Sequence, residues 1–282
     1  MCRPMRGIEG PPDSGPSFEA REPLILPESR LRKMDMLLLA VAAGAIAGGF
    51  VQGLSGFAFG LVAMSFWAWS VEPQMAAAMS VFGGLCGQVI AAISVRRIFN
   101  PRAVGPYLIG GLAGLPIGIT ILPLLDIHLF RTFLGSLLVL WTPLMLFAHK
   151  LPRITVGRWA NAVIGITGGI ISPLGGYNGA VLTIWGTLRG LAKDPMRNII
   201  QNFNLGMLSA TMVAYLATGI VTSAMIPMFA IVAPAMIIPT VFGTRLYIGI
   251  SETTFRRIIL SLLFLSGVAL LTSSLPQVLS RL

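Results

Sequence analysis

Long apolar segments separated by short polar connections make up most of this chain. Ten of them follow one another, and the few charges inside them lie near their ends. A segment of about twenty apolar residues matches the roughly 30 Å hydrocarbon core of a bilayer. The pattern predicts helices at 36–52, 57–70, 75–95, 104–124, 129–147, 157–172, 176–189, 196–218, 224–243 and 255–274. The predicted fold class is an all-α polytopic membrane protein.

Two of these segments are too short to cross a bilayer, and both follow a glycine-rich stretch. Segments 57–70 and 176–189 have about fourteen residues, which make a helix of roughly 21 Å. The stretch GGFVQGLSGFAFG at 48–60 precedes the first, and GGIISPLGGYNGA at 168–180 precedes the second. The two stretches align without a gap. Each therefore predicts a broken or re-entrant helix at the same place in two related parts of the chain.

Further matches follow in the same order and extend the relation. An acid–proline turn at 72–73 aligns with one at 194–195, and the string FRTFLGSLLVL aligns with FRRIILSLLFL. We therefore predict two homologous membrane repeats, 36–150 and 151–282. Residues 1–35 contain balanced charges, prolines and no long apolar core, which is typical of a disordered tail.

The distribution of basic residues predicts how the two repeats are oriented. The chain carries a formal net charge of +10. Loops rich in Lys and Arg usually face the cytoplasm. Three basic residues each occur in the connections 96–102, 150–158, 189–197 and 245–257, whereas 71–74 and 219–224 have none. Because equivalent loops of the two repeats differ in charge, we predict an inverted-topology repeat, as in many secondary transporters.

Basic residues before the first segment oppose one detail of this arrangement. The mirrored form requires a first hairpin, 36–52 with 57–70, that opens away from the cytoplasm. Arg30, Arg32 and Lys33 precede this hairpin, and the positive-inside rule places them in the cytoplasm. In that alternative the first segment crosses once and the halves are not perfect mirrors. We prefer the mirrored form.

The two breaks are the candidate functional site. Irregular backbone at membrane depth is tolerated where it is buried in protein or lines an aqueous cavity. Freed N–H groups and helix N-termini there favour an anion. Helix packing without a ligand is the alternative for the glycines, and we expect it at Gly48, Gly60, Gly110, Gly114 and Gly118. The predicted substrate-binding residues are Gln52, Gly53, Ser55, Gly56, Ser172, Gly175, Gly176, Tyr177, Asn178, Asn202 and Asn204.

Other function classes lack their signatures in the sequence. There is no ATP-binding G-x-x-x-x-G-K-[ST] motif, no histidine inside a span, and no mid-span Asp or Glu. We therefore predict no enzyme, no metal and no cofactor. The basic loops follow the positive-inside rule, so we predict a lipid bilayer and a small anion as partners and no nucleic acid. The oligomeric state stays open.

Together these features resemble the TauE/SafE family of sulfite exporter-like transporters. A glycine-rich break opens each half, an acid–proline turn follows, and FR leads the final apolar span; the resemblance covers about 36–275. It implies export of sulfite, sulfoacetate or other small organosulfur and carboxylate anions across a bacterial inner membrane. We therefore expect a secondary transporter of small anions. The alternative is a non-transporting membrane scaffold or a subunit of a larger complex.

Overall fold

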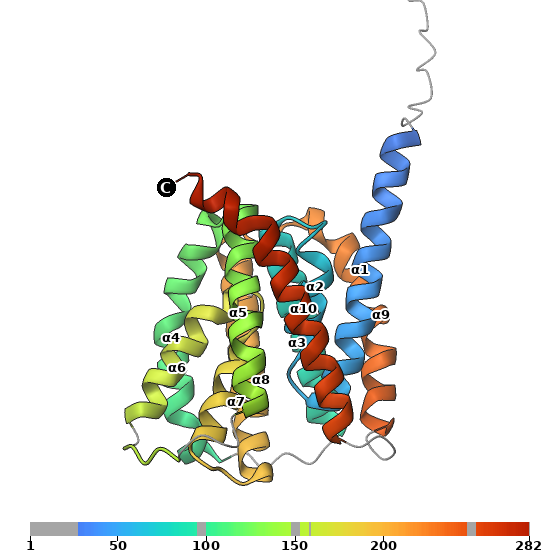
Figure 1. Ribbon diagram of the computed structural model, residues 1–282. Helices are drawn as coiled ribbons and strands as arrows, with labels where there is room; N and C mark the ends of the chain where they lie inside the picture. Colours follow the sequence, from blue (N-terminus) through green and yellow to red (C-terminus); the bar gives the residue numbers. More distant parts are fainter. Residues whose placement is uncertain (1–27, 95–99, 148–152, 158, 247–251, 282) are drawn as a thin grey trace, which may run out of the picture.

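The fold is a bundle of helices, and no strand occurs in the part of the chain that the structure describes (Figure 1). The computed structural model describes residues 28–94, 100–147, 153–157, 159–246 and 252–281. Its α-helices are α1 (Glu28–Ser55), α2 (Phe59–Trp67), α3 (Pro73–Ser94), α4 (Pro101–Ile121), α5 (Ile127–Phe147), α6 (Trp159–Ile171), α7 (Asn178–Leu188), α8 (Lys193–Ala217), α9 (Ile226–Leu246) and α10 (Glu252–Leu279). Short 3-10 helices cover Leu122–Leu124, Ser172–Leu174 and Ser223–Met225.

Among the described residues, six helices are long and apolar enough to cross a membrane, namely those over Met34–Ser55, Pro73–Ile93, Pro101–Leu124, Ile127–Phe147, Ser223–Thr244 and Arg257–Leu279. The predicted class of all-helical membrane protein is therefore confirmed. Helices α2 and α7 have 9 and 11 residues and are therefore shorter than the predicted segments 57–70 and 176–189, because the breaks take up the first residues of each segment. Helix α1 begins at Glu28, so the last residues of the predicted tail, 28–35, are helical and precede the predicted span in the same helix. The rest of the predicted tail lies outside the described residues.

Consecutive helices alternate in direction, which gives the two halves opposite orientations. In Figure 1, α1 descends from the top of the view and α2 returns upward, whereas α6 rises from the bottom and α7 returns downward. In the part of the chain that the structure describes, each half contributes five α-helices, so every α-helix of the first half runs opposite to its equivalent in the second. An inverted repeat requires this arrangement. The repeat as a superposable relation between the halves stays a prediction.

The halves interlock through helix pairs that glycines bring close together. Helix α1 packs on α9, and α4 packs on α6, so the first helix of each half contacts the fourth helix of the other. A Cβ on Gly110, Gly114 or Gly118 would lie within 2.2 Å of a carbonyl oxygen of α6. A Cβ on Gly49 would lie 2.5 Å from the Met236 carbonyl oxygen of α9. The packing role predicted for the glycines of α4 is therefore confirmed.

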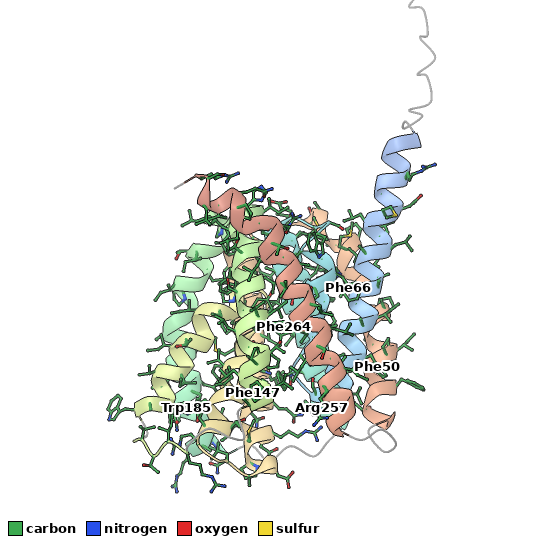
Figure 2. All side chains as sticks on the ribbon, in the orientation of Figure 1. Phe50, Phe66, Phe147, Trp185, Arg257 and Phe264 are labelled. Atoms are coloured by element: carbon green, nitrogen blue, oxygen red, sulfur yellow. The ribbon has the colours of Figure 1, made fainter. Side chains whose placement is uncertain are left out.

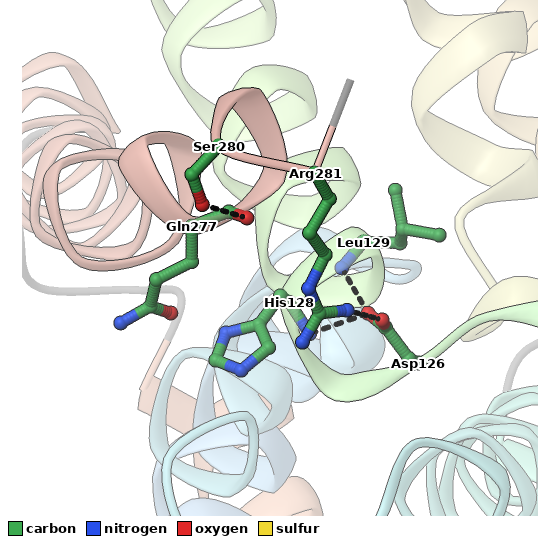
Figure 3. A network of polar contacts seen from close by, with 6 residues as sticks. All are labelled: Asp126, His128, Leu129, Gln277, Ser280 and Arg281. Atoms are coloured by element: carbon green, nitrogen blue, oxygen red, sulfur yellow. Dashed lines mark hydrogen bonds and ion pairs between the residues drawn. The ribbon is translucent and has the colours of Figure 1, made fainter.

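A polar network joins α5 and α10 at the upper end of the bundle, opposite the end where Arg257 begins the last span (Figures 2 and 3). The Asp126 carboxylate accepts N–H bonds from His128 and Leu129 at 2.9 and 2.8 Å and pairs with Arg281. Hydrogen bonds from the backbone N–H of Leu129 are the main cause that lowers the pKa of Asp126, and Arg281 adds to it. The network caps the N-terminus of α5 and ties it to the C-terminal end of the chain.

Candidate functional site

The first break separates α1 from α2 at residues 56–58. Gly56 has a φ of +84°, a left-handed conformation that favours glycine. The Ser55 hydroxyl accepts bonds from the N–H groups two and three residues later, at 3.4 and 3.2 Å, and the side-chain amide oxygen of Gln52 accepts the Phe59 N–H at 3.0 Å. These N–H groups are therefore bonded inside the protein. They are not free for an anion, contrary to our expectation from the sequence.

The second break separates α6 from α7. The 3-10 turn Ser172–Leu174 follows α6, and Gly175 and Gly176 then take φ values of +144° and +73°. Both values lie in the region that side chains other than glycine rarely adopt. No side chain caps α7, whose N-cap residue is Tyr177. The two consecutive left-handed glycines reverse the chain and aim α7 back toward the end from which α6 came.

Polar side chains of α3 and α8 hold the second break. The Ser80 hydroxyl of α3 donates to the Gly175 carbonyl at 2.7 Å. On α8, the Thr211 hydroxyl shares a hydrogen bond with the Ser172 hydroxyl at 2.8 Å. The Tyr215 hydroxyl, also on α8, donates to the carbonyl of Pro173. All three clamping side chains are buried. A polar residue in an apolar helix here satisfies backbone groups that the break has released.

The two breaks touch one another directly. A Cβ on Gly60, in the first turn of α2, would lie 2.3 Å from the carbonyl oxygen of Gly175. A Cβ on Gly179, in the first turn of α7, would lie 3.0 Å from Cβ of Phe57. Each short helix therefore begins against the break of the other half. The sequence-based expectation that the breaks come together is confirmed by these contacts.

The breaks lie at different depths and pass one another. On α3, Ser80 holds the second break, and the Gln88 side chain donates to the Gly56 carbonyl at 2.7 Å to hold the first. Eight residues of α-helix span about 12 Å. Each hairpin therefore reaches past the other, whereas we expected two tips at one level. The overlap gives each break a wall made from the other half of the protein.

Several buried polar atoms at the breaks have no hydrogen-bond partner among the described residues. They are Nε2 of Gln52, the hydroxyl of Tyr177, both amide atoms of Asn178 and Oδ1 of Asn204. These four side chains are at most 2% exposed. Leaving a buried polar group unpaired costs about 1–3 kcal/mol. The concentration of such atoms at two glycine breaks is therefore a marker of a site for a polar ligand.

Charged side chains do not contribute to this cluster. Every charged side chain that the structure describes is at least partly exposed, and the described arginines and carboxylates lie near helix ends and in connections. The donors at the breaks are thus neutral amides and a phenol. Neutral donors can bind an anion without the cost of burying a permanent counter-charge.

The remaining predicted residues have structural contacts of their own. Gly53 lies within α1, where a Cβ would meet the Thr240 carbonyl oxygen of α9 at 2.3 Å, so it packs helices and does not form the tip. The hydroxyls of Ser55 and Ser172 are occupied by the bonds described above. Asn202 is buried on α8 but stands two positions from Asn204, and such residues face different directions on a helix.

Sequence reasoning missed the side chains that hold the breaks. Ser80, Thr211 and Tyr215 were not among the predicted site residues. Gln88 and Gln201, which lie at the first break, were not among them either; a Cβ on Gly56 would lie 3.1 Å from the Gln201 amide nitrogen. The feature that these residues share in the sequence is a polar side chain within an apolar helix, α3 or α8. Hydroxyls are too frequent in membrane helices for that signal to select them.

Comparison with protein families matches residues 40–270 to the family described as Sulfite exporter TauE/SafE. The match covers most of the chain, both breaks and the helices α3 and α8 that hold them. The resemblance stated from the sequence is therefore confirmed. A search of curated proteins gave no match, and a search of solved structures gave none either.

Proposed function

Since this chain belongs to the TauE/SafE family, which consists of membrane transporters of the sulfite exporter type rather than enzymes, we propose that it exports small anions. The candidate cargoes are sulfite, sulfonates and other organosulfur or carboxylate anions, carried out of a bacterial cell across its inner membrane. One observation supports this most: five of the eight unpartnered buried polar atoms among the described residues lie at two helix breaks that enter from opposite ends of the bundle.

Three side chains of the proposed site can donate hydrogen bonds to the anion. Nε2 of Gln52 and the Asn178 amide nitrogen are donors, and the Tyr177 hydroxyl can donate as well. The anion then replaces water with fixed neutral dipoles inside the protein, which keeps the cost of leaving the solvent low. Because each break is built against the other half, a small relative movement of the halves exposes the site to one side at a time. Such rocking about a fixed site is the common mechanism of transporters with two repeats.

The membrane potential is the proposed driving force. No carboxylate that the structure describes is buried in a span, so we assign no proton relay to the protein's own side chains. A potential of about 100 mV, negative inside, drives one negative charge outward with roughly 2.3 kcal/mol. That energy supports a concentration ratio of about fifty. A monovalent anion would therefore leave the cell without obligatory proton coupling.

Flux in proteoliposomes tests the proposal. The purified protein is reconstituted, and release of labelled sulfite, sulfonates and carboxylates is followed with and without protein. We expect at least one of these anions to be moved and Asn178→Ala to lower its flux by about tenfold or more, from the lost charge-assisted bond of about 1.5–3 kcal/mol. Thr167→Val is the matched control, because this exposed threonine of α6 bonds only its own helix at 3.2 Å. Equal flux in liposomes with and without the protein, for the whole panel, would contradict the proposal.

A further inference from the structure

The buried site offers unpartnered acceptors as well as unpartnered donors. Asn178 is fully buried, and its amide oxygen and nitrogen both lack a partner among the described residues. An amide oxygen only accepts hydrogen bonds, and an amide nitrogen only donates them. Because both atoms are free, exchanging their assignment changes nothing. The site therefore contains at least one oxygen that needs a proton from its ligand.

A second acceptor lies on the neighbouring helix. Oδ1 of Asn204 on α8 is buried and unpartnered, and the same amide's nitrogen lies 2.7 Å from where a Cβ on Gly179 would be. Gly179 directly follows Asn178, so the Asn204 side chain lies against the first turn of α7, the turn that Asn178 begins. In contrast, the Gln52 amide is fixed with its nitrogen free, because its oxygen accepts the Phe59 N–H. Donors and acceptors are thus both built into the wall.

An anion that can only accept hydrogen bonds does not match this wall. Sulfate, fully deprotonated sulfite or a simple alkyl sulfonate would satisfy the Gln52 and Asn178 nitrogens but leave the oxygens of Asn178 and Asn204 buried and unpaired. A binding site that pairs a ligand's hydroxyl strongly rejects the analogue without it, since its own polar groups then stay unpaired. A ligand with its own O–H satisfies both kinds of group.

Resting on the proposed function, we propose that the site selects a monoanion carrying a hydrogen-bond donor of its own, such as hydrogen sulfite or a hydroxyalkyl sulfonate, over anions that only accept. Because the wall carries no charge, it also favours a ligand with one negative charge over a ligand with two. With only amides and a phenol as donors, a second negative charge has no buried counter-charge among the described residues. Burying an uncompensated charge costs far more than leaving one hydrogen bond unmade.

A matched pair of sulfonates tests this selectivity. 2-Hydroxyethanesulfonate and ethanesulfonate carry the same single charge and differ only by one hydroxyl. In proteoliposomes containing the wild-type protein, we expect flux of the hydroxylated anion at limiting concentration to exceed that of ethanesulfonate by about tenfold or more, equivalent to about 1.4 kcal/mol. This wild-type ratio needs no variant and so does not depend on any substitution folding correctly.

Two variants assign the preference to the wall. Asn204→Leu removes one acceptor at similar volume, so we expect the flux ratio to fall several-fold toward one. Thr167→Val, an exposed polar-to-apolar change on α6, should leave the ratio at its wild-type value. A ratio in Asn204→Leu as high as in the wild type would overturn the role of this oxygen and with it the proposal.

The outcomes separate this inference from the proposed function. If both sulfonates are carried at equal rates, a buried water serves the asparagine oxygens and the selectivity proposal is wrong, while anion transport stands. If ethanesulfonate is preferred, the proposal is wrong as well. If liposomes with protein move none of the tested anions faster than empty ones, both the inference and the proposed function are contradicted.

Discussion

Replacing Gly60 by alanine should drive the two breaks apart. The new Cβ would lie 2.3 Å from the Gly175 carbonyl oxygen and 2.7 Å from the hydroxyl of Ser80. The first of these atoms is backbone, which cannot rotate out of the way. The methyl group would also enter the 2.7 Å hydrogen bond that Ser80 donates to Gly175. The substitution therefore disrupts the contact that joins the two breaks.

The expected loss of stability follows from these contacts. Overpacking a well-filled interior costs about 1–3 kcal/mol, and a lost internal hydrogen bond costs about 0.5–1.5 kcal/mol. Replacing glycine by alanine inside a helix returns about 0.5–1 kcal/mol. The sum is a net destabilisation of about 0.5–4 kcal/mol for Gly60→Ala. Gly105→Ala on α4 is the control, since a Cβ there meets nothing within 4 Å and should stabilise the protein slightly.

Thermal unfolding in detergent, followed by the loss of monomeric protein on size exclusion, measures both variants side by side. We expect Gly60→Ala to unfold at a clearly lower temperature than the wild type and Gly105→Ala to unfold at the same temperature or higher. Anion flux should fall in Gly60→Ala even below its unfolding temperature, because the wall of the site shifts. If Gly60→Ala is as stable as Gly105→Ala, the breaks do not touch in the way described.

Four further outcomes are expected. In vesicles at equal pH on both sides, a potassium potential set with valinomycin should drive anion flux in the direction given by its sign; flux that follows only an imposed pH gradient would refute electrogenic export. Arg281→Ala should lower the free energy of unfolding by less than about 1 kcal/mol, since exposed ion pairs contribute little. The pKa of Asp126 is lowered in the folded protein, so its contribution should be full at neutral pH and disappear as the pH falls through that lowered pKa in an acid unfolding series. Single cysteines at Glu72 and Arg257 should be labelled from opposite sides of the membrane, and labelling from one side would exclude the alternation of helices described here.

The places of both breaks could be predicted from the sequence, because aligned glycine-rich stretches interrupt apolar helices at 48–60 and 168–180. Irregular backbone inside a membrane is tolerated only where protein or an aqueous cavity surrounds it. Buried polar side chains next to them, such as Asn178 and Asn204, were predictable for the same cause. The residue at which α1 ends was harder to predict. Gly53 resembles a residue of the hairpin tip, yet it lies within α1 and packs this helix against α9. Small residues permit both roles, and only the partner helix decides between them.

The capping of the first break could not be predicted. The sequence does not show which group accepts a freed backbone N–H. The bonds that the Gln52 and Ser55 side chains accept exist only because the chain folds back over one turn. The overlap of the hairpins was hidden for a similar reason. It depends on which positions of α3, Ser80 and Gln88, contact which break, and such long-range pairings leave no local pattern.

The exchange of helix partners between the halves has a consequence for how the protein is made. The glycine face of α1 is covered by α9, and the bond from Thr240 to the Gly49 carbonyl joins residues 191 positions apart. At a synthesis rate of about 5–20 residues per second, α1 stays without this partner for roughly 10–40 s after it emerges. During that time its glycine face is covered only by lipid or by the insertion machinery. In the nascent chain, α1 is therefore made first but reaches its final packing only after α9, near the end of synthesis.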